Sequence, residues 1–197
     1  MIAKRFFDLF FTIPGLIVLS PLFCIVALLI KNDSKGPVFF KQIRVGQYGK
    51  LFAIYKFRTM VLQAEQKGKQ ITIGADARIN RSGVFLRKYK LDELPQLINV
   101  LKGEMSLVGP RPEVPRYVAE YPAEVKEKIL SVPPGITDYA SIEYHEENAL
   151  LGKAENPEDF YIKEILPIKI SYYLRYVKER NLWVDFVIIL KTLKCIV

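Results

Sequence analysis

The chain has 197 residues, with 29 lysines and arginines against 21 acids and a formal net charge of +8. Two cysteines, Cys24 and Cys195, exclude a disulfide framework. A single histidine, His145, excludes a histidine-rich metal site and a Ser/His triad. The length suits one domain with a hydrophobic core plus an appendage. The positive charge indicates an anionic partner such as a phospholipid surface, a phosphorylated substrate or a nucleic acid.

An uncharged stretch of 22 residues, from Leu9 to Ile30, lies near the N-terminus. As a helix it would be about 33 Å long, enough to cross a bilayer. Basic residues flank it on both sides, which gives a single-pass helix no direction but suits two ends on the cytoplasmic face. Ser20-Pro21 lies in the middle, where proline removes a helical hydrogen bond. The residues alone leave two interpretations open: a kinked transmembrane helix, or a re-entrant helix with arms at Arg5–Leu19 and Pro21–Ile30.

Two short apolar stretches follow, at 37–43 and 51–55, with Gly46 and Gly49 between them. Apolar runs of this length around a glycine-containing turn predict a small β-hairpin. The polar segment at 67–80 contains two glycines and predicts a loop.

Helical spacing of apolar residues predicts the rest of the fold. The predicted helices are a short one opened by Ser82 or Gly83, one from near Asp92 to Lys102, one at 113–130, and two amphipathic ones at 166–179 and 183–194. The last two carry aromatic residues opposite a basic face, which suits amphipathic helices at a membrane interface. Helices packed on their own core would give the same pattern. We therefore expect an α+β fold that is mainly helical, with residues 1–30 as a membrane unit.

Asp92 and Glu93 form an acidic pair at the predicted start of the helix that Gly103 ends. In one interpretation Asp92 is a helix N-cap and Glu93 complements the helix dipole. The other interpretation uses the same geometry for chemistry. A helix N-terminus favours bound phosphate, and a carboxylate there could attack phosphorus while its neighbour holds Mg²⁺ through a hard oxygen ligand. Asp92 would then be the nucleophile and Glu93 the metal ligand.

The surroundings of the pair are basic, with five lysines and arginines and no acid among residues 77–91. Arginine offers a bidentate fork to phosphate, and lysine offers a point charge. The candidates for binding phosphate or substrate are Lys56, Arg58, Arg87 and Arg111. The last of these lies between the prolines of a Gly-Pro-Arg-Pro turn, which fix the backbone that presents it.

The segment LDELPQLINVLKGEMSLVGPRP, from Leu91 to Pro112, resembles the core of the bacterial sugar transferases, the monotopic phosphoglycosyl transferases. The resemblance covers nearly the whole chain. It includes KRFFDL at 4–9, IKNDSKGPVFFKQIRVG at 30–46, YKFRTM at 55–60 and RINRSGVFLRKYKLDELPQL at 78–97. The chain departs from the pattern at Asp138, where many members have glycine, so the resemblance does not imply which sugar is used.

The resemblance implies an enzyme of the bacterial cytoplasmic membrane, with a re-entrant helix broken at Ser20-Pro21 and residues 31–197 as a catalytic domain on the cytoplasmic face. It implies transfer of a sugar-1-phosphate from a UDP-sugar to polyprenol (undecaprenyl) phosphate, with release of UMP. Asp92 would carry a covalent phosphosugar, and Glu93 would hold Mg²⁺. This reaction would be the first membrane step of assembling a capsule, O-antigen, exopolysaccharide or glycoprotein glycan.

The main alternative is a non-enzymatic basic module that binds membranes, in which the positive charge docks on anionic lipid and Asp92 is only a cap. A phosphodiesterase that hydrolyses a UDP-sugar is a minor alternative. Nucleic-acid binding is disfavoured because the chain has an apolar anchor and no nucleic-acid motif. The sequence is also compatible with a homodimer.

Overall fold

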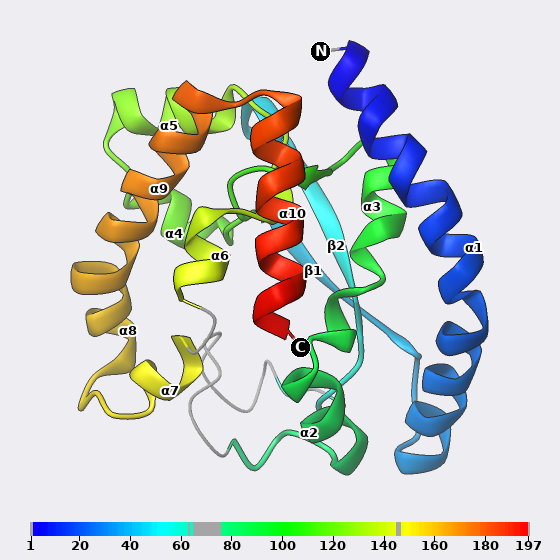
Figure 1. Cartoon of the computed structure of the whole chain (residues 1–197). Helices are drawn as coiled ribbons and strands as arrows, with labels where there is room; N and C mark the ends of the chain where they lie inside the picture. Colours follow the sequence, from blue (N-terminus) through cyan, green and yellow to red (C-terminus); the bar gives the residue numbers. More distant parts are fainter. Residues whose placement is uncertain (1, 63, 65–75, 145–146, 197) are drawn as a thin grey trace.

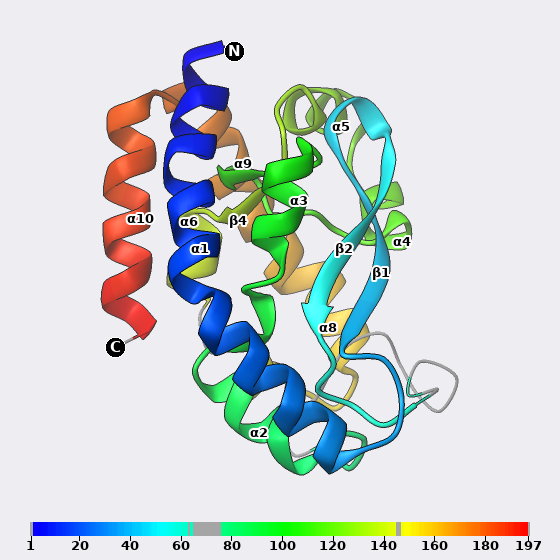
Figure 2. The same cartoon turned by 90° about the vertical axis from the view of Figure 1, so that its right-hand side faces the viewer.

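The structure, a computed structural model, describes residues 2–62, 64, 76–144 and 147–196. The loop predicted at 67–80 falls largely outside these residues, and so does His145. Figure 1 shows helices arranged around two small sheets, and Figure 2 shows the β-hairpin on the side of the molecule opposite the C-terminal helix.

Helix α1 spans Ile2–Asp33 and has Pro14 and Pro21 inside it. Among the described residues it is the one helix that is long and apolar enough to cross a membrane, by length and composition. Most of its apolar side chains are not covered by the rest of the chain, since only 11% of its most apolar window is buried. Such an uncovered apolar surface requires an apolar environment, which supports membrane association.

The break predicted at Ser20-Pro21 is not an interruption of the helix. Pro21 has no N–H to donate to the carbonyl of Ile17, and the Ser20 hydroxyl donates to that oxygen instead, at 2.8 Å. The backbone therefore stays helical through both residues. The two predicted arms are one continuous helix, whose axis changes direction near its middle (Figure 2).

Strands β1 (Phe39–Val45) and β2 (Leu51–Phe57) pair antiparallel, with Phe39 opposite Phe57 and Val45 opposite Leu51. The connection contains a short 3-10 turn, η1 (Gln47–Gly49), in which Gly49 has φ 76°. Glycine adopts this left-handed conformation without a steric penalty. The predicted hairpin is confirmed.

A second sheet joins β3 (Ser106–Val108) to β4 (Gly135–Thr137) in parallel. Two glycines allow the backbones to meet at its end. A Cβ atom on Gly109 would lie 2.5 Å from the carbonyl oxygen of Pro133, and one on Gly135 would lie 2.1 Å from the Gly109 nitrogen. The sequence does not indicate this sheet, because strands of three residues are too short to show an alternating pattern.

The remaining elements are helical, which confirms the mainly helical α+β class. They are α2 (Arg81–Lys88), η2 (Leu91–Glu93), α3 (Gln96–Lys102), α4 (Pro115–Ala119), α5 (Ala123–Leu130), α6 (Tyr139–Glu143), α7 (Glu147–Leu151), α8 (Pro157–Phe160), η3 (Tyr161–Ile165), α9 (Leu166–Glu179) and α10 (Leu182–Ile196). The helix predicted at 113–130 is two helices, because Pro122 lies at the N-cap of α5. The helix predicted from Asp92 is a 3-10 turn followed by α3.

The two C-terminal amphipathic helices differ in their surroundings. Helix α9 packs on the core, with Tyr173 and Tyr176 buried. Helix α10 buries Ile188 but leaves Trp183 71% exposed and Leu193 56% exposed. Packing on the core therefore accounts for the pattern of α9, whereas α10 retains an exposed apolar face of the kind expected at a membrane interface.

Polar contacts attach the N-terminal half of α1 to the rest of the chain. The guanidinium of Arg5 donates to the carbonyls of Val100 and Leu101 at the end of α3. The buried Asp8 carboxylate accepts a hydrogen bond from the Ser106 hydroxyl at 3.0 Å. These contacts fix α1 against the segment that leads into the Gly-Pro-Arg-Pro turn.

Candidate active site

The acidic pair lies in a turn rather than at a helix cap. Lys90 adopts the left-handed conformation (φ 54°) and directs the chain from α2 into η2, which contains Asp92 and Glu93. Pro95, not Asp92, is the N-cap residue of α3. Among the described residues no group donates a hydrogen bond to the Asp92 carboxylate, although its side chain is only 8% exposed. The capping interpretation of Asp92 is therefore wrong.

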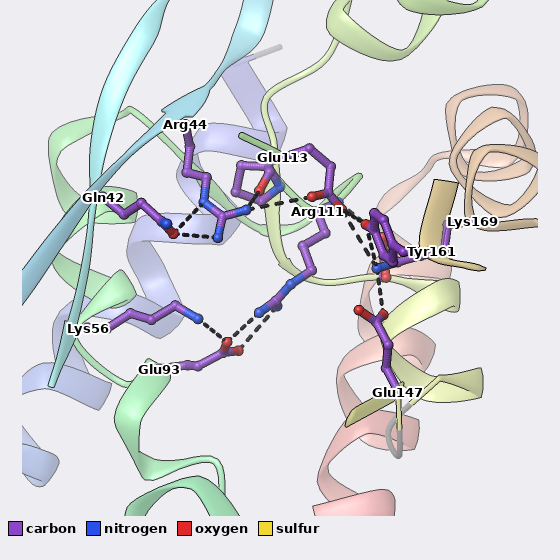
Figure 3. A network of polar contacts seen from close by, with 11 residues as sticks. Gln42, Arg44, Lys56, Glu93, Arg111, Glu113, Glu147, Tyr161 and Lys169 are labelled. Atoms are coloured by element: carbon purple, nitrogen blue, oxygen red, sulfur yellow. Dashed lines mark hydrogen bonds and ion pairs between the residues drawn. The ribbon is translucent and has the colours of Figure 1, made fainter. Parts of the chain in front are cut away.

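Glu93 is held between two cations (Figure 3). The Lys56 ammonium donates to Oε1 of Glu93 at 2.7 Å. The Arg111 guanidinium donates Nη1–H to Oε2 at 3.2 Å and Nη2–H to Oε1. Strand β2, the turn η2 and the Gly-Pro-Arg-Pro turn thus each contribute one side chain to a single cluster.

Asn99 explains how β2 comes to lie against this turn. Its side-chain amide donates to the carbonyl of Ala53 at 2.8 Å, and its side-chain oxygen accepts from the Tyr55 N–H at 2.9 Å. The side chain therefore continues the hydrogen-bonding pattern at the strand edge and fixes β2 against α3. Lys56, the residue after Tyr55, is thereby placed beside Glu93.

The pKa values of the two neighbouring carboxylates are shifted in opposite directions. Burial, together with the charge of Glu93, raises the pKa of Asp92 above its usual value. Burial alone would also raise the pKa of Glu93, but Arg111 and Lys56 hold it well below its usual range. Burial lowers the pKa of Lys56, and Glu93 opposes that shift. The cluster therefore holds an ionised Glu93 beside a more easily protonated Asp92, a separation typical of functional carboxylate pairs.

The two other predicted phosphate ligands have different surroundings. Arg87 lies on α2, lines the same cleft as Asp92, and donates Nε–H to the Thr59 hydroxyl at 2.9 Å. Arg58 is only 4% exposed and donates to the carbonyls of Ser34 and Lys35, both at 2.8 Å. Two of its five N–H donors therefore hold the chain that follows α1. Arg58 also lines the cleft, and its Nε has no partner among the described residues, so its role in binding phosphate stays a prediction.

A cleft of about 1460 Å³ contains the site. Its walls include Lys56, Arg87, Asp92, Glu93 and Arg111. A cavity of this size accommodates a ligand larger than a simple phosphate.

A second polar network, which the sequence did not predict, lies on the other side of Arg111 (Figure 3). Buried Glu113 accepts a hydrogen bond from the Tyr161 hydroxyl at 2.8 Å and lies 3.7 Å from the Lys169 ammonium. Arg44 lies 3.6 Å from the other oxygen of Glu113. These residues come from three distant parts of the chain, around positions 44, 113 and 161–169, so no local motif could have joined them.

The carboxylates fit a magnesium ion only together with a phosphorylated ligand. No three His, Cys, Asp or Glu side chains come together as a metal cage in the part of the chain that the structure describes. Mg²⁺ does not require one, because it commonly binds one or two carboxylates and takes its other oxygens from substrate phosphates and water. Asp92 and Glu93 supply such a carboxylate pair, although Lys56 and Arg111 already engage Glu93.

Comparison with known proteins identifies the family of the chain. The family model described as "Bacterial sugar transferase" matches residues 1–197. The chain belongs to this family. One relative is the UDP-N-acetylgalactosamine-undecaprenyl-phosphate N-acetylgalactosaminephosphotransferase of Aeromonas hydrophila, which is 39% identical over 98% of the chain and 43% of the relative. Another is the UDP-glucose:undecaprenyl-phosphate glucose-1-phosphate transferase of Escherichia coli, which is 35% identical over 97% of the chain and 39% of the relative.

Shorter members of the bacterial sugar transferase family also match. The Bacillus subtilis sugar transferase EpsL is 43% identical over 72% of the chain and 69% of its own length. The chain spans about two fifths of the length of the Aeromonas and Escherichia relatives.

Proposed function

We propose that this protein transfers a sugar-1-phosphate from a UDP-sugar to a membrane-held polyprenol phosphate, through a covalent intermediate on Asp92. The observation that carries the proposal is a buried Asp92, which has no hydrogen-bond donor among the described residues, beside a Glu93 that Lys56 and Arg111 hold ionised. The names of the relatives, which include two UDP-sugar:undecaprenyl-phosphate transferases, support the classes of donor and acceptor.

In the first step an oxygen of ionised Asp92 attacks the phosphorus that bears the sugar. The bond from that phosphorus to the bridging oxygen of the diphosphate breaks, and UMP leaves with the electron pair. Lys56, Arg87 and Arg111 line the cleft around Asp92 and can take up the charge of the diphosphate. A Mg²⁺ ion bound by Glu93 and the diphosphate would supply further neutralisation of the leaving phosphate.

In the second step an oxygen of the polyprenol phosphate attacks the same phosphorus. The phosphorus–oxygen bond to Asp92 breaks, which restores the carboxylate and yields a polyprenyl-diphosphate sugar. No proton transfer is needed in either step, because both nucleophiles are anions.

The acceptor is a lipid, so its phosphate must reach Asp92 at the membrane surface. Helix α1 leaves most of its apolar surface uncovered, and its C-terminal part packs through Val26 and Ile30 on the cluster that contains Phe57 of β2. Phe57 directly follows Lys56 of the site. We place the cleft at the cytoplasmic face of the membrane on the strength of this connection and of the basic residues on both sides of the apolar stretch.

The test is release of UMP by the full chain in nanodiscs, with Mg²⁺ and a UDP-sugar, in the presence and absence of undecaprenyl phosphate. We expect sustained release only with the acceptor, and loss of release when Mg²⁺ is chelated. Sustained release without acceptor would identify a hydrolase. Absence of release with every donor, together with salt-sensitive binding to anionic vesicles, would favour the non-enzymatic membrane module.

A further inference from the structure

The side chains that line the cleft differ in chemical type between the two sides of Arg111. On the side of Asp92 its charged side chains are mainly lysines and arginines. On the other side the walls carry hydroxyl groups and carboxylates, namely those of Glu113, Tyr117, Ser141, Glu147 and Tyr161, together with Lys169. A diphosphate suits the cationic side, whereas the hydroxyl-rich side suits a neutral ligand with many hydroxyl groups.

Lys169 organises the hydroxyl-rich side (Figure 3). The residue is only 4% exposed, and its ammonium donates to Oε2 of Glu147 at 2.7 Å and to the Tyr161 hydroxyl at 3.3 Å. Tyr161 in turn donates to Glu113 at 2.8 Å. These bonds hold α7, η3, α9 and the chain after the Gly-Pro-Arg-Pro turn in one arrangement, so the walls of this part of the cleft are preorganised.

Several polar atoms on this side have no partner among the residues that the structure describes. The Tyr117 hydroxyl is buried and unpaired, and so is the Ser141 hydroxyl on α6. Burial raises the pKa of Tyr117 to about 12, so its hydroxyl stays protonated and can donate. The second oxygen of Glu147 is also unengaged by described residues, whereas Oε2 accepts from Lys169. Buried polar atoms are rarely left unpaired, so both hydroxyls still need a partner. Neighbouring atoms cover the two hydroxyls, so each would meet a ligand through a rotation of its side chain toward the cleft that Tyr117 and Ser141 line, whereas the Glu147 carboxylate is 27% exposed and directly accessible.

We infer that this wall, formed by Tyr117, Ser141 and Glu147, binds the sugar ring of the donor and selects which sugar is transferred. The inference rests on the proposed function. The sugar is directly bonded to the phosphorus that Asp92 attacks, whereas the ribose is separated from it by a second phosphate. Glu113 follows Arg111 by two residues, so its Cα lies within about 7 Å of that of Arg111. The hydroxyl-rich wall is therefore placed where the sugar, rather than the ribose, extends from the phosphorus.

The Tyr117 and Ser141 hydroxyls, which have no described partner, can be removed one at a time to test their part in binding. Tyr117→Phe and Ser141→Ala each remove a hydroxyl that has no described partner, so they should leave the folded protein as stable as before or slightly more stable. Tyr173→Phe is the matched control, because the Tyr173 hydroxyl is also buried and unpaired but its residue does not line the cleft. Lys169 and Glu113 are unsuitable for this purpose, since removing either would leave a buried charge without its partner.

The experiment measures kcat/KM for UMP release by the full chain in nanodiscs with UDP-glucose, UDP-galactose, UDP-N-acetylglucosamine and UDP-N-acetylgalactosamine. It also measures the inhibition constant of UMP. We expect Tyr117→Phe and Ser141→Ala to lower kcat/KM by about 3- to 10-fold for the preferred donor and by different factors for the others. The inhibition constant of UMP should not change, and Tyr173→Phe should match the wild type.

Three results would overturn the inference. Unchanged kcat/KM for every donor would assign the unpaired hydroxyls no part in binding. An equal loss for all donors, with a parallel rise in the inhibition constant of UMP, would assign the wall to the nucleoside. A wild-type protein that turns over none of the donors would remove the proposed function and the subsite with it.

Discussion

Arg111 donates from both terminal nitrogens of its guanidinium to the two carboxylate oxygens of Glu93. This bidentate pair joins the turn η2 to the Gly-Pro-Arg-Pro turn, across 18 positions of the chain. It also leaves Asp92, the neighbour of Glu93, without a described hydrogen-bond donor. Two adjacent carboxylates therefore differ: cations neutralise Glu93, whereas Asp92 has no hydrogen-bond donor among the described residues.

Replacing Arg111 by lysine tests whether activity requires the bidentate hydrogen bonding to Glu93 and not the positive charge alone. Arg111→Lys keeps a cation but cannot reproduce two parallel hydrogen bonds to Glu93. We expect kcat/KM for UMP release to fall by about 10- to 100-fold. Arg116→Lys is the control, because that side chain is 61% exposed in its ion pair with Glu158 and should retain wild-type activity. An Arg111→Lys variant as active as the wild type would show that activity does not require the bidentate hydrogen bonding to Glu93.

Asp92→Asn should abolish activity without lowering stability. The raised pKa means that the charged carboxylate is less favourable in the folded protein than in the unfolded chain. A neutral amide of the same shape should therefore leave Tm unchanged or raise it, while UMP release is lost. Glu93→Gln should lower Tm, because Lys56 and Arg111 lose their anionic partner. Calorimetry of the three proteins checks this, and a lower Tm for Asp92→Asn would restore a structural role for that carboxylate.

The pH dependence of the rate should report the same carboxylate. Only ionised Asp92 can attack, and its pKa lies above the ordinary value of 3.8, so activity should fall as the pH drops through that raised pKa. Glu93 does not set this limit, because its pKa lies well below 4.5 and it stays ionised there. The profile of kcat/KM against pH tests the assignment. An acid limb at or below 3.8 would contradict it.

Gly109→Ala should disturb the turn that presents Arg111. The new methyl group would lie 2.5 Å from the Pro133 carbonyl oxygen, and neither backbone can move without breaking the β3–β4 pairing. We expect a loss of about 1–3 kcal/mol in the free energy of unfolding together with lower activity. Gly15→Ala is a suitable control, because nothing lies within 4 Å of the position of its Cβ atom. Equal stability of the two variants would show that the turn can adjust.

The two ends of α1 should be accessible from the same side of the membrane. The basic residues on both flanks and the change in direction of the helix axis near its middle (Figure 2) favour a re-entrant path. In a chain with both natural cysteines replaced by serine, Ile2→Cys and Lys31→Cys should each react with an impermeant maleimide applied to inside-out vesicles. Labelling of the two positions from opposite faces would identify a transmembrane helix.

The sequence predicted the parts of this molecule that local patterns encode. Apolar runs around Gly46 and Gly49 located the hairpin, and the motif from Leu91 to Pro112 contains both Glu93 and Arg111, which the structure brings together. Local patterns could not show that Lys169 reaches Glu113 across 56 positions, because tertiary packing alone determines that contact. They also could not show that Arg58 binds backbone carbonyls, since a buried and an exposed arginine look alike in a sequence.

The most direct test of the central claim is the mass of the intact protein after incubation with Mg²⁺ and a panel of UDP-sugars, without acceptor. We expect a gain equal to one sugar phosphate with the correct donor, absent in Asp92→Asn and removed when undecaprenyl phosphate is added. UMP release that needs the acceptor, without any adduct in its absence, would contradict a covalent intermediate on Asp92.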